Sequence, residues 1–219
     1  MASSPMEEIL LQVTEDYRIG KEKLVKSNFP KSITAFGSAR IPSDSEHYKE
    51  IVEISALCAK RIKEKGKDIG FITGGGPSVM TAWLKGAYEN GGNCAGISLV
   101  LAHETEKDQS PFVNKEASSM MRTFPARKAL MMEYSKAIII FKGGFGTMDE
   151  MFEVFTLIQT NKIPNIPVFV YPSDFYKGVF NFETFLADKT IKQEDIDRIQ
   201  FCDTKQELID KLYTLIDND

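Results

Sequence analysis

The sequence AIIIFKGGFGTMDE, residues 137–150, decides the fold class of this 219-residue chain. Its first five residues are all apolar, which is typical of a strand that is buried on both faces of a parallel sheet. A glycine-rich turn follows, and the residues after it predict a helix that continues to about residue 160. A strand, a turn and a helix in direct succession indicate one βα unit of an α/β protein.

The rest of the chain repeats this alternation. The periodicity predicts strands at 32–36, 69–73, 94–100, 137–141, 167–171 and 199–202, and further helices at 47–65, 77–90, 125–134, 175–186 and 205–217. The stretch 101–122 has little periodicity and is predicted to be a long loop. The alternation predicts a Rossmann-like, doubly wound, mainly parallel sheet with helices on both faces.

No internal repeat, low-complexity tract or linker divides the chain, so we expect a single domain over residues 1–219. Residues 1–30 form an N-terminal helical extension. Within it, 6–27 reads as an amphipathic helix that precedes the first strand and belongs to no βα unit. We expect this helix to pack across the domain or onto a partner subunit.

Composition and charge exclude several classes of function. The net charge of −4 gives no reason to expect nucleic acid or an anionic membrane as a partner. The three cysteines show neither a disulfide framework nor a metal-ligand spacing, and the two histidines, His47 and His103, are too few for a histidine-rich metal site. We therefore predict no metal and no cofactor. With no signal peptide and no membrane-spanning run, a cytoplasmic location is expected.

Glycine-rich turns follow three of the predicted strands. They are Gly37-Ser38, Gly74-Gly75-Gly76 and Gly143-Gly144-Phe145-Gly146. In doubly wound sheets ligands bind at the carboxyl ends of the strands, near the switch in strand order. The three turns could therefore converge on one crevice, although each taken alone is also compatible with a tight crossover.

The last of these turns carries the sharpest chemical signal. Glycines let backbone N–H groups come close to a ligand, and the start of the following helix is a ready anion site, to which Thr147 adds a hydroxyl. Alternatively, Thr147 and Glu150 form a capping box, because T-x-x-E is its signature. A capping Glu150 could not also activate water. The glycine spacing matches neither the dinucleotide-binding fingerprint nor a P-loop.

The segment FPARKALM, residues 124–131, precedes the apolar strand. Arg127 could bind phosphate or orient a carboxylate in a bidentate manner, with Lys128 as its solvent-side neighbour. Glu153 lies one helical turn beyond Glu150 and could support it, or could be an exposed acid or one that covers the edge of the core. Met131 and Phe145 could contact the base or sugar of a ligand, or could belong to the core.

These segments together resemble the Lonely Guy (LOG) family, whose members have often been misannotated as lysine decarboxylases. The sequence GGFGTMDE is similar to its G-G-x-G-T-x-x-E core, and Arg127-Lys128 with Met131 matches its R-K-x-x-M. The two earlier glycine turns, the second with Met80, resemble the family's earlier loops. The resemblance covers roughly residues 32–171.

The resemblance implies a homodimer that cleaves nucleoside 5′-monophosphates, AMP or a cytokinin ribotide for example, to free base and ribose 5-phosphate. It also implies that Arg127 and Glu150 are the catalytic pair and that Gly143, Gly144, Gly146 and Thr147 hold the phosphate. We expect Arg127 to keep Glu150 ionised, because a neighbouring cation lowers the pKa of a carboxyl. Three departures from the family pattern favour a general nucleotide hydrolase over a cytokinin-specific one: Lys142 in place of proline, Phe124-Pro125 in place of Met-His, and the lack of a further glycine before Met80.

Two other classes of function stay open at this point. One is a nucleotide or cofactor carrier that shares the fold and does not hydrolyse its ligand. The other is a decarboxylase, which needs pyridoxal phosphate and a Schiff-base lysine, and no recognisable setting for such a lysine is found.

Overall fold

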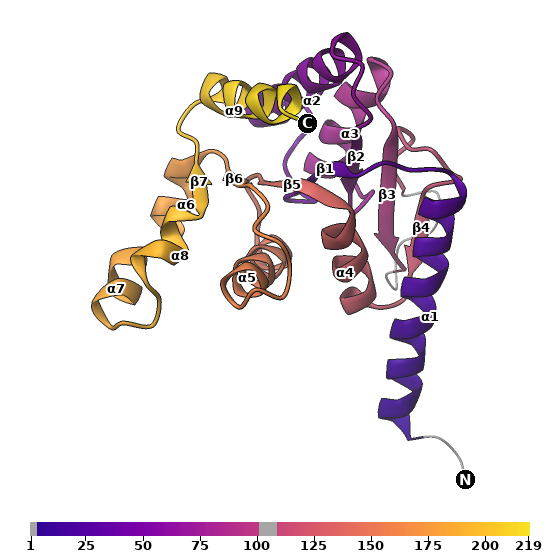
Figure 1. Cartoon of the computed structure of the whole chain (residues 1–219), viewed down its shortest axis with the longest axis horizontal. Coiled ribbons are helices and arrows are strands. Elements are labelled where there is room, and N and C mark those ends of the chain that lie inside the picture. The colour runs from indigo at the N-terminus through magenta and orange to yellow at the C-terminus, as the bar shows by residue number, and fades with distance from the viewer. Residues whose placement is uncertain (1–3, 101–108) are drawn as a thin grey trace.

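The computed structural model describes residues 4–100 and 109–219. At its centre is a seven-stranded sheet in the order β4-β3-β2-β1-β5-β6-β7 (Figure 1). Its strands are β1 (Ser32–Phe36), β2 (Gly70–Thr73), β3 (Cys94–Leu99), β4 (Ser119–Met121), β5 (Ser135–Ile140), β6 (Val168–Val170) and β7 (Ile199–Phe201). Each neighbouring pair runs parallel. The predicted fold class is therefore confirmed, with a sheet that is wholly rather than mainly parallel in the part described.

The strand order reverses between β1 and β5. The chain proceeds outward from β1 to β4, then returns to place β5 beside β1, with Phe36 opposite Ile140. The turns that contain Gly37 and Gly143 therefore leave adjacent strands at the switch point, where ligands bind in folds of this class.

Helices cover both faces of the sheet. They are α1 (Pro5–Lys26), α2 (Glu46–Glu64), α3 (Val79–Glu89), α4 (Phe124–Tyr134), α5 (Phe145–Gln159), α6 (Ser173–Val179), α7 (Phe182–Ala187), α8 (Gln193–Asp197) and α9 (Lys205–Asp217). One apolar cluster joins α2, α3 and α9 to the sheet, and a second joins α1, α4, α5 and α6 to its other face (Figure 1). The strands are buried from both sides, which explains why they are almost uniformly apolar.

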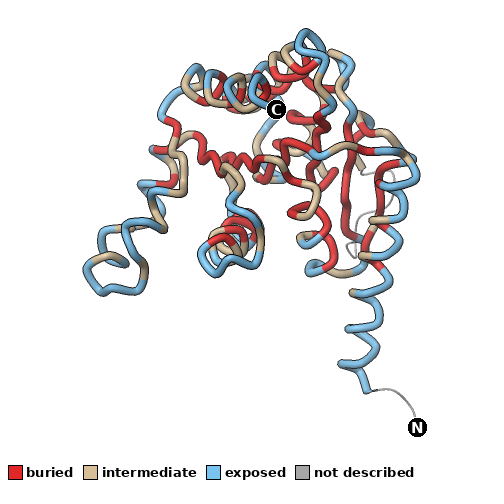
Figure 2. The backbone as a smooth tube through the Cα atoms, in the orientation of Figure 1, coloured by how far each residue is buried: buried red, intermediate tan, exposed pale blue. Residues whose placement is uncertain are grey.

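The helix α1 packs across the domain with only its second half. Gly20 lies against Met121 and Leu130, and a side chain in its place would overlap both. Asp16, also buried, accepts hydrogen bonds from the backbone and side chain of Arg122. The first half of α1 extends beyond the body of the protein and is exposed (Figure 2).

Three elements differ from the sequence-based predictions. The strand β4 lies within the predicted loop 101–122, where three residues are too few to show a periodicity. The helix predicted at 175–186 is two helices, because the chain turns at Phe180 and Asn181 caps α7 through a hydrogen bond from the Thr184 N–H. The short α8 is polar and has no apolar stripe that would reveal it. No helix in the described part of the chain is long and apolar enough to cross a membrane.

Candidate active site

A cavity of about 380 Å³ lies at the carboxyl ends of the strands, where the three glycine turns meet. Its wall includes residues that follow β1, β2 and β5 together with residues of α4 and α5. Of the predicted site residues, it is lined by Gly37, Ser38, Gly74, Gly75, Gly76, Arg127, Gly144, Phe145, Gly146, Thr147 and Glu150. The fold thus brings together segments that are more than a hundred residues apart in the sequence.

Arg127 and Glu150 form an ion pair inside this cavity. The Nη2 atom of Arg127 lies 3.1 Å from Oε1 of Glu150, and about a tenth of each side chain is exposed. Arg127 comes from the first turn of α4, and Glu150 from the second turn of α5. A buried charge needs a partner because its desolvation is costly, so each side chain stabilises the charged form of the other.

The guanidinium of Arg127 is held from two further sides. Its Nε donates a hydrogen bond of 2.9 Å to the carbonyl oxygen of Ile97 in β3. Its Nη2 lies so close to Gly74 that a methyl group on that residue would overlap it. Glycine at position 74 therefore provides the space for the arginine, which is a structural reason for the first glycine of the second turn.

Burial outweighs the effect of Arg127 on the pKa of Glu150. Removal from water raises the pKa of the Glu150 carboxyl to about 7, and the charge of Arg127 opposes this rise. Arg127 does lower the pKa of this carboxyl, as predicted. The prediction that the pKa is low overall is wrong, because the effect of burial is larger. The sequence identifies the charged neighbour but not how far the pair is buried.

The helix α5 begins three residues earlier than a capping box with Thr147 at the N-cap would require. Gly144 occupies the N-cap position, and no side chain caps the first turn. The capping interpretation of Thr147 and Glu150 is therefore wrong. Thr147 instead packs against Gly143, where a side chain would overlap its hydroxyl. Gly143 thus leaves room for the side chain of Thr147, and it is not among the residues that line the cavity.

Gly75 has its own structural requirement. It adopts a positive φ of 67°, which side chains of L-residues rarely tolerate, and a methyl group there would overlap Ser98 Oγ. Gly37 is required by packing, because a methyl group there would overlap the side chain of Val79. The first two turns are thus explained by the fold itself as well as by their place on the cavity wall.

Besides Gly143, three predicted residues lie outside the cavity: Met131, Lys128 and Glu153. Met131 is fully buried in the core between α4 and the sheet, so the expectation that it contacts substrate is not met by this arrangement. Lys128 is no solvent-side neighbour, since only 12% of its side chain is exposed. It forms ion pairs with Asp149 at 2.8 Å and with Glu153 at 2.5 Å. These pairs tie α4 to α5 and so fix the two helices that carry Arg127 and Glu150.

Several lining residues were not predicted as site residues from the sequence. They are Arg40, Met80, Ser98, Gln109 and Phe124 among others. Arg40 is the most informative, because a cation three residues after the Gly37 turn is a recognisable sign of an anion site. Gln109 donates a 3.0 Å hydrogen bond to Ser98. This pair could not be predicted, because Gln109 lies in the stretch 101–122, whose sequence has little periodicity. Of the two histidines, His103 lies outside the described residues.

The second histidine, His47, is buried on α2 against the rings of Phe141 and Tyr171. Burial, and then the charge of Lys142, lowers its pKa to about 4, so it stays neutral at ordinary pH. Lys142 itself does not line the cavity. Within the described ranges, no group of three or more His, Cys, Asp or Glu side chains is arranged to hold a metal ion.

Comparison with known proteins identifies the family of this chain. A family model described as possible lysine decarboxylase matches residues 80–212, which is more than half of the chain and includes α4, β5 and α5. That name is often given to the LOG family domain. This chain belongs to the LOG family. The resemblance drawn from the two charged motifs and the glycine turns is therefore confirmed.

Solved structures with the LOG fold are similar over most of this chain. A molybdenum cofactor carrier protein from Chlamydomonas reinhardtii is 18% identical with a TM-score of 0.53, covering 87% of this chain and 99% of that one. The molybdenum cofactor binding protein of Rippkaea orientalis is 16% identical with a TM-score of 0.50, covering 84% and 95%. At these identities the likeness establishes the fold alone.

The fold is also similar to that of a protein that is not described as a carrier. The DNA processing protein A of Streptococcus pneumoniae is 13% identical with a TM-score of 0.51, and the match covers 84% of this LOG-family chain and 62% of that protein. No curated protein matches the chain significantly. What this member acts on must therefore be argued from its own cavity.

Proposed function

We propose that this protein hydrolyses the N-glycosidic bond of nucleoside 5′-monophosphates and releases the free base and ribose 5-phosphate. The observation that carries the proposal is the buried Arg127–Glu150 pair, which lies in the same cavity as the uncapped start of α5. One part of the cavity wall suits a phosphate, and another offers a carboxylate for the reacting carbon.

The phosphate is assigned to the start of α5. Backbone N–H groups of a first helical turn and the positive end of the helix dipole favour an anion. Gly144 and Gly146 have no positive φ, and a methyl group on either would meet nothing within 4 Å. The fold therefore gives no reason for glycine at these two positions, whereas a phosphate lying against the backbone does. Arg40, in the turn after β1, also lines the cavity and adds a cation.

Glu150 is assigned the chemical step. Cleavage of an N-glycosidic bond develops positive charge on the ribose, which a carboxylate stabilises while it takes a proton from the attacking water. With a pKa of about 7, Glu150 is present in both protonation states near neutral pH, as a general base must be to accept and then return a proton. Arg127 holds the carboxylate in position.

The base is assigned to the apolar side of the mouth. Phe124 and Phe145 both line the cavity while their rings are 50% and 98% exposed. An aromatic ring with so little protein contact is available to stack on a purine or pyrimidine. Stacking accepts every base, so it favours a general nucleotide substrate.

The competing function is that of a carrier, and the similarity to molybdenum cofactor carriers favours it. A carrier needs the anion site but has no use for a buried carboxyl with a raised pKa, so Glu150 argues for the enzyme. The decarboxylase function is disfavoured by the lining itself, since no described residue of the cavity wall is a lysine that could form a Schiff base.

We further propose that the protein is a homodimer. Met6, Ile9 and Leu10 on the first half of α1 are each at least 50% exposed and lie on one side of the helix. A helix of this kind is marginal in water unless its apolar side is covered. Light scattering on the full chain should show a dimer, and Leu10→Ser should shift it toward monomer. A wild-type monomer at high concentration would contradict the proposal.

The decisive experiment for the activity uses a panel of nucleoside monophosphates. The protein is incubated with each nucleotide, and the released bases are separated by chromatography. Release of base from at least one monophosphate, with none from the matching nucleoside, is the expected result. If AMP binds in a calorimetric titration but no base is released from any member, the protein is a carrier.

A further inference from the structure

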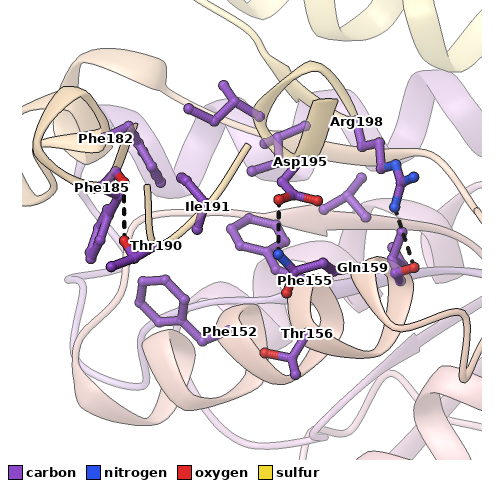
Figure 3. Close-up of a pocket in the computed structure, with 14 residues that line it drawn as sticks. Phe152, Phe155, Thr156, Gln159, Phe182, Phe185, Thr190, Ile191, Asp195 and Arg198 are labelled. Carbon is purple, nitrogen blue, oxygen red and sulfur yellow. Dashed lines mark hydrogen bonds between the residues drawn. The ribbon is translucent and has the colours of Figure 1, made fainter. Parts of the chain in front are cut away.

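A second cavity, of about 310 Å³, lies between α5 and the segment that contains α7, α8 and β7 (Figure 3). It shares no lining residue with the cavity that holds Arg127 and Glu150. Its volume is at the lower end of the range of about 300–1,000 Å³ for small-molecule pockets. The proposed hydrolysis has no use for it, so its role is a separate question.

The helix α5 is a wall common to both cavities. Glu150 and Phe152 are two residues apart on this helix, and at about 100° per residue their side chains leave on nearly opposite sides. Glu150 lines the first cavity and Phe152 the second. The second cavity therefore lies behind the catalytic helix, not within the substrate site.

Aromatic rings face each other across this cavity. Phe152 and Phe155 of α5 pack edge to face, 6.1 Å apart. On the other side, Phe182 and Phe185 of α7 lie 6.3 Å apart. Among the described residues, no ring of the first pair directly contacts a ring of the second, and in Figure 3 the two pairs stand on separate walls. Phe180 bridges the pairs, because its ring lies 5.0 Å from that of Phe152 and 5.9 Å from that of Phe182. A third ring inserted between them could make the offset or edge-to-face contacts that aromatic pairs prefer.

The charged side chains of the cavity, Asp195 and Arg198, lie toward its other end, whereas Thr190 lies beside Phe185 (Figure 3). Asp195 is occupied, because it accepts hydrogen bonds from Gln159 Nε2 and from the backbone N–H of Lys192, both at Oδ2. Arg198 makes one long hydrogen bond of 3.5 Å from Nη1 to the carbonyl oxygen of Ile158. No acidic side chain of the described residues forms an ion pair with it. A guanidinium has five N–H donors, so Arg198 can still donate to a ligand.

We propose that this cavity binds a compact aromatic molecule, with its ring between the Phe152–Phe155 and Phe182–Phe185 pairs and one acceptor group facing Arg198. The ring suits the apolar walls, and the acceptor suits Arg198, the one cation among the described lining residues. Because α5 carries Glu150 on its other side, such a ligand binds next to the catalytic helix without touching the substrate. The proposal is independent of the reaction assigned to the first cavity.

The test uses two probes on the full-length protein. Indole is a neutral planar ring, and 1-anilinonaphthalene-8-sulfonate is an aromatic anion whose fluorescence rises when it is buried. Binding of indole is followed by saturation-transfer NMR and binding of the sulfonate by fluorescence titration. Phe185→Ala removes one wall of the cavity, and because Phe185 is 38% exposed the fold should tolerate its loss.

Phe185→Ala is expected to weaken both probes about 2- to 10-fold, the range for loss of one aromatic contact. Arg198→Met keeps the apolar stem, so it should weaken the sulfonate and leave indole unchanged. Ile191→Trp narrows the cavity and should abolish binding of both. Far-UV circular dichroism and the melting temperature establish that each variant is folded.

Two control variants complete the design. Phe145→Ala removes the exposed ring of the first cavity, and Leu10→Ala removes an exposed apolar side chain of α1. Neither should change probe binding. If either weakens the probes as much as Phe185→Ala does, the probes bind the substrate cavity or the exposed helix, and the proposal is wrong. It is equally wrong if folded Phe185→Ala and Ile191→Trp bind both probes as the wild type does.

Discussion

Gly74 and Arg127 are in direct contact, so that the guanidinium of Arg127 occupies the space that any side chain at position 74 would fill. The two residues come from different βα units, the turn after β2 and the first turn of α4. This contact, together with the hydrogen bond to the Ile97 carbonyl, aims Arg127 at Glu150. The position of the ion pair therefore depends on a glycine that makes no polar contact with it.

Gly74→Ala should displace Arg127 and so disrupt the pair without changing any charged residue. Forcing a methyl group into a filled site typically costs about 1–3 kcal/mol of unfolding free energy. We expect a lower melting temperature and a loss of hydrolysis. Gly178→Ala is the matched control, because a methyl group there meets nothing within 4 Å. Equal activity of the Gly74→Ala variant and wild type would show that Arg127 need not be held in this position.

Glu150→Gln should leave nucleotide binding measurable and reduce hydrolysis of AMP. Loss of a general base typically lowers the rate by about 10²–10⁴-fold. Base release is measured by chromatography, and AMP binding by calorimetry. Glu64→Gln, an exposed glutamate on α2, serves as the control. Turnover that is undiminished in Glu150→Gln would end the assignment of this residue.

Gly146→Ala distinguishes a glycine that the fold requires from one that the bound phosphate requires. A methyl group at Gly146 meets no protein atom, and alanine is preferred over glycine in a helix by about 0.5–1 kcal/mol, so thermal stability should be unchanged or higher. The methyl group would crowd a phosphate at the start of α5. Loss of one charge-assisted hydrogen bond corresponds to a rise in KM of about 10- to 100-fold. An unchanged KM for AMP would place the phosphate elsewhere in the cavity.

Glu150 should also make stability depend on pH. Its pKa is raised from 4.5 to about 7 by burial, so the folded protein holds this proton more tightly than the unfolded chain does. The resulting stabilisation is fully present below pH 4.5 and is lost as pH rises through 7. The free energy of unfolding of Glu150→Gln relative to wild type should therefore increase between pH 4.5 and 8, by roughly 3 kcal/mol at most. Urea titrations across this range measure it, and a difference that is constant with pH would contradict the raised pKa.

Much of the fold could be predicted from the sequence, because it depends on local patterns. The strand Ser32–Phe36 and the helix Lys205–Asp217 have the predicted bounds, since an apolar run and an amphipathic period are properties of neighbouring residues. The strand β4 could not be found in this way. Its three residues form a strand because β3 offers them a free edge, which is a matter of position and not of pattern.

The sequence by itself determined the α/β alternation, the three glycine turns and the presence of a basic and an acidic motif, because each is a pattern of neighbouring residues. Only the tertiary structure decided that Gly74 makes room for Arg127, that Gly143 leaves room for Thr147, and that Met131 belongs to the core. It also decided the pKa of Glu150. A carboxyl's pKa depends on how much water surrounds it, and that is set by every segment that packs against it.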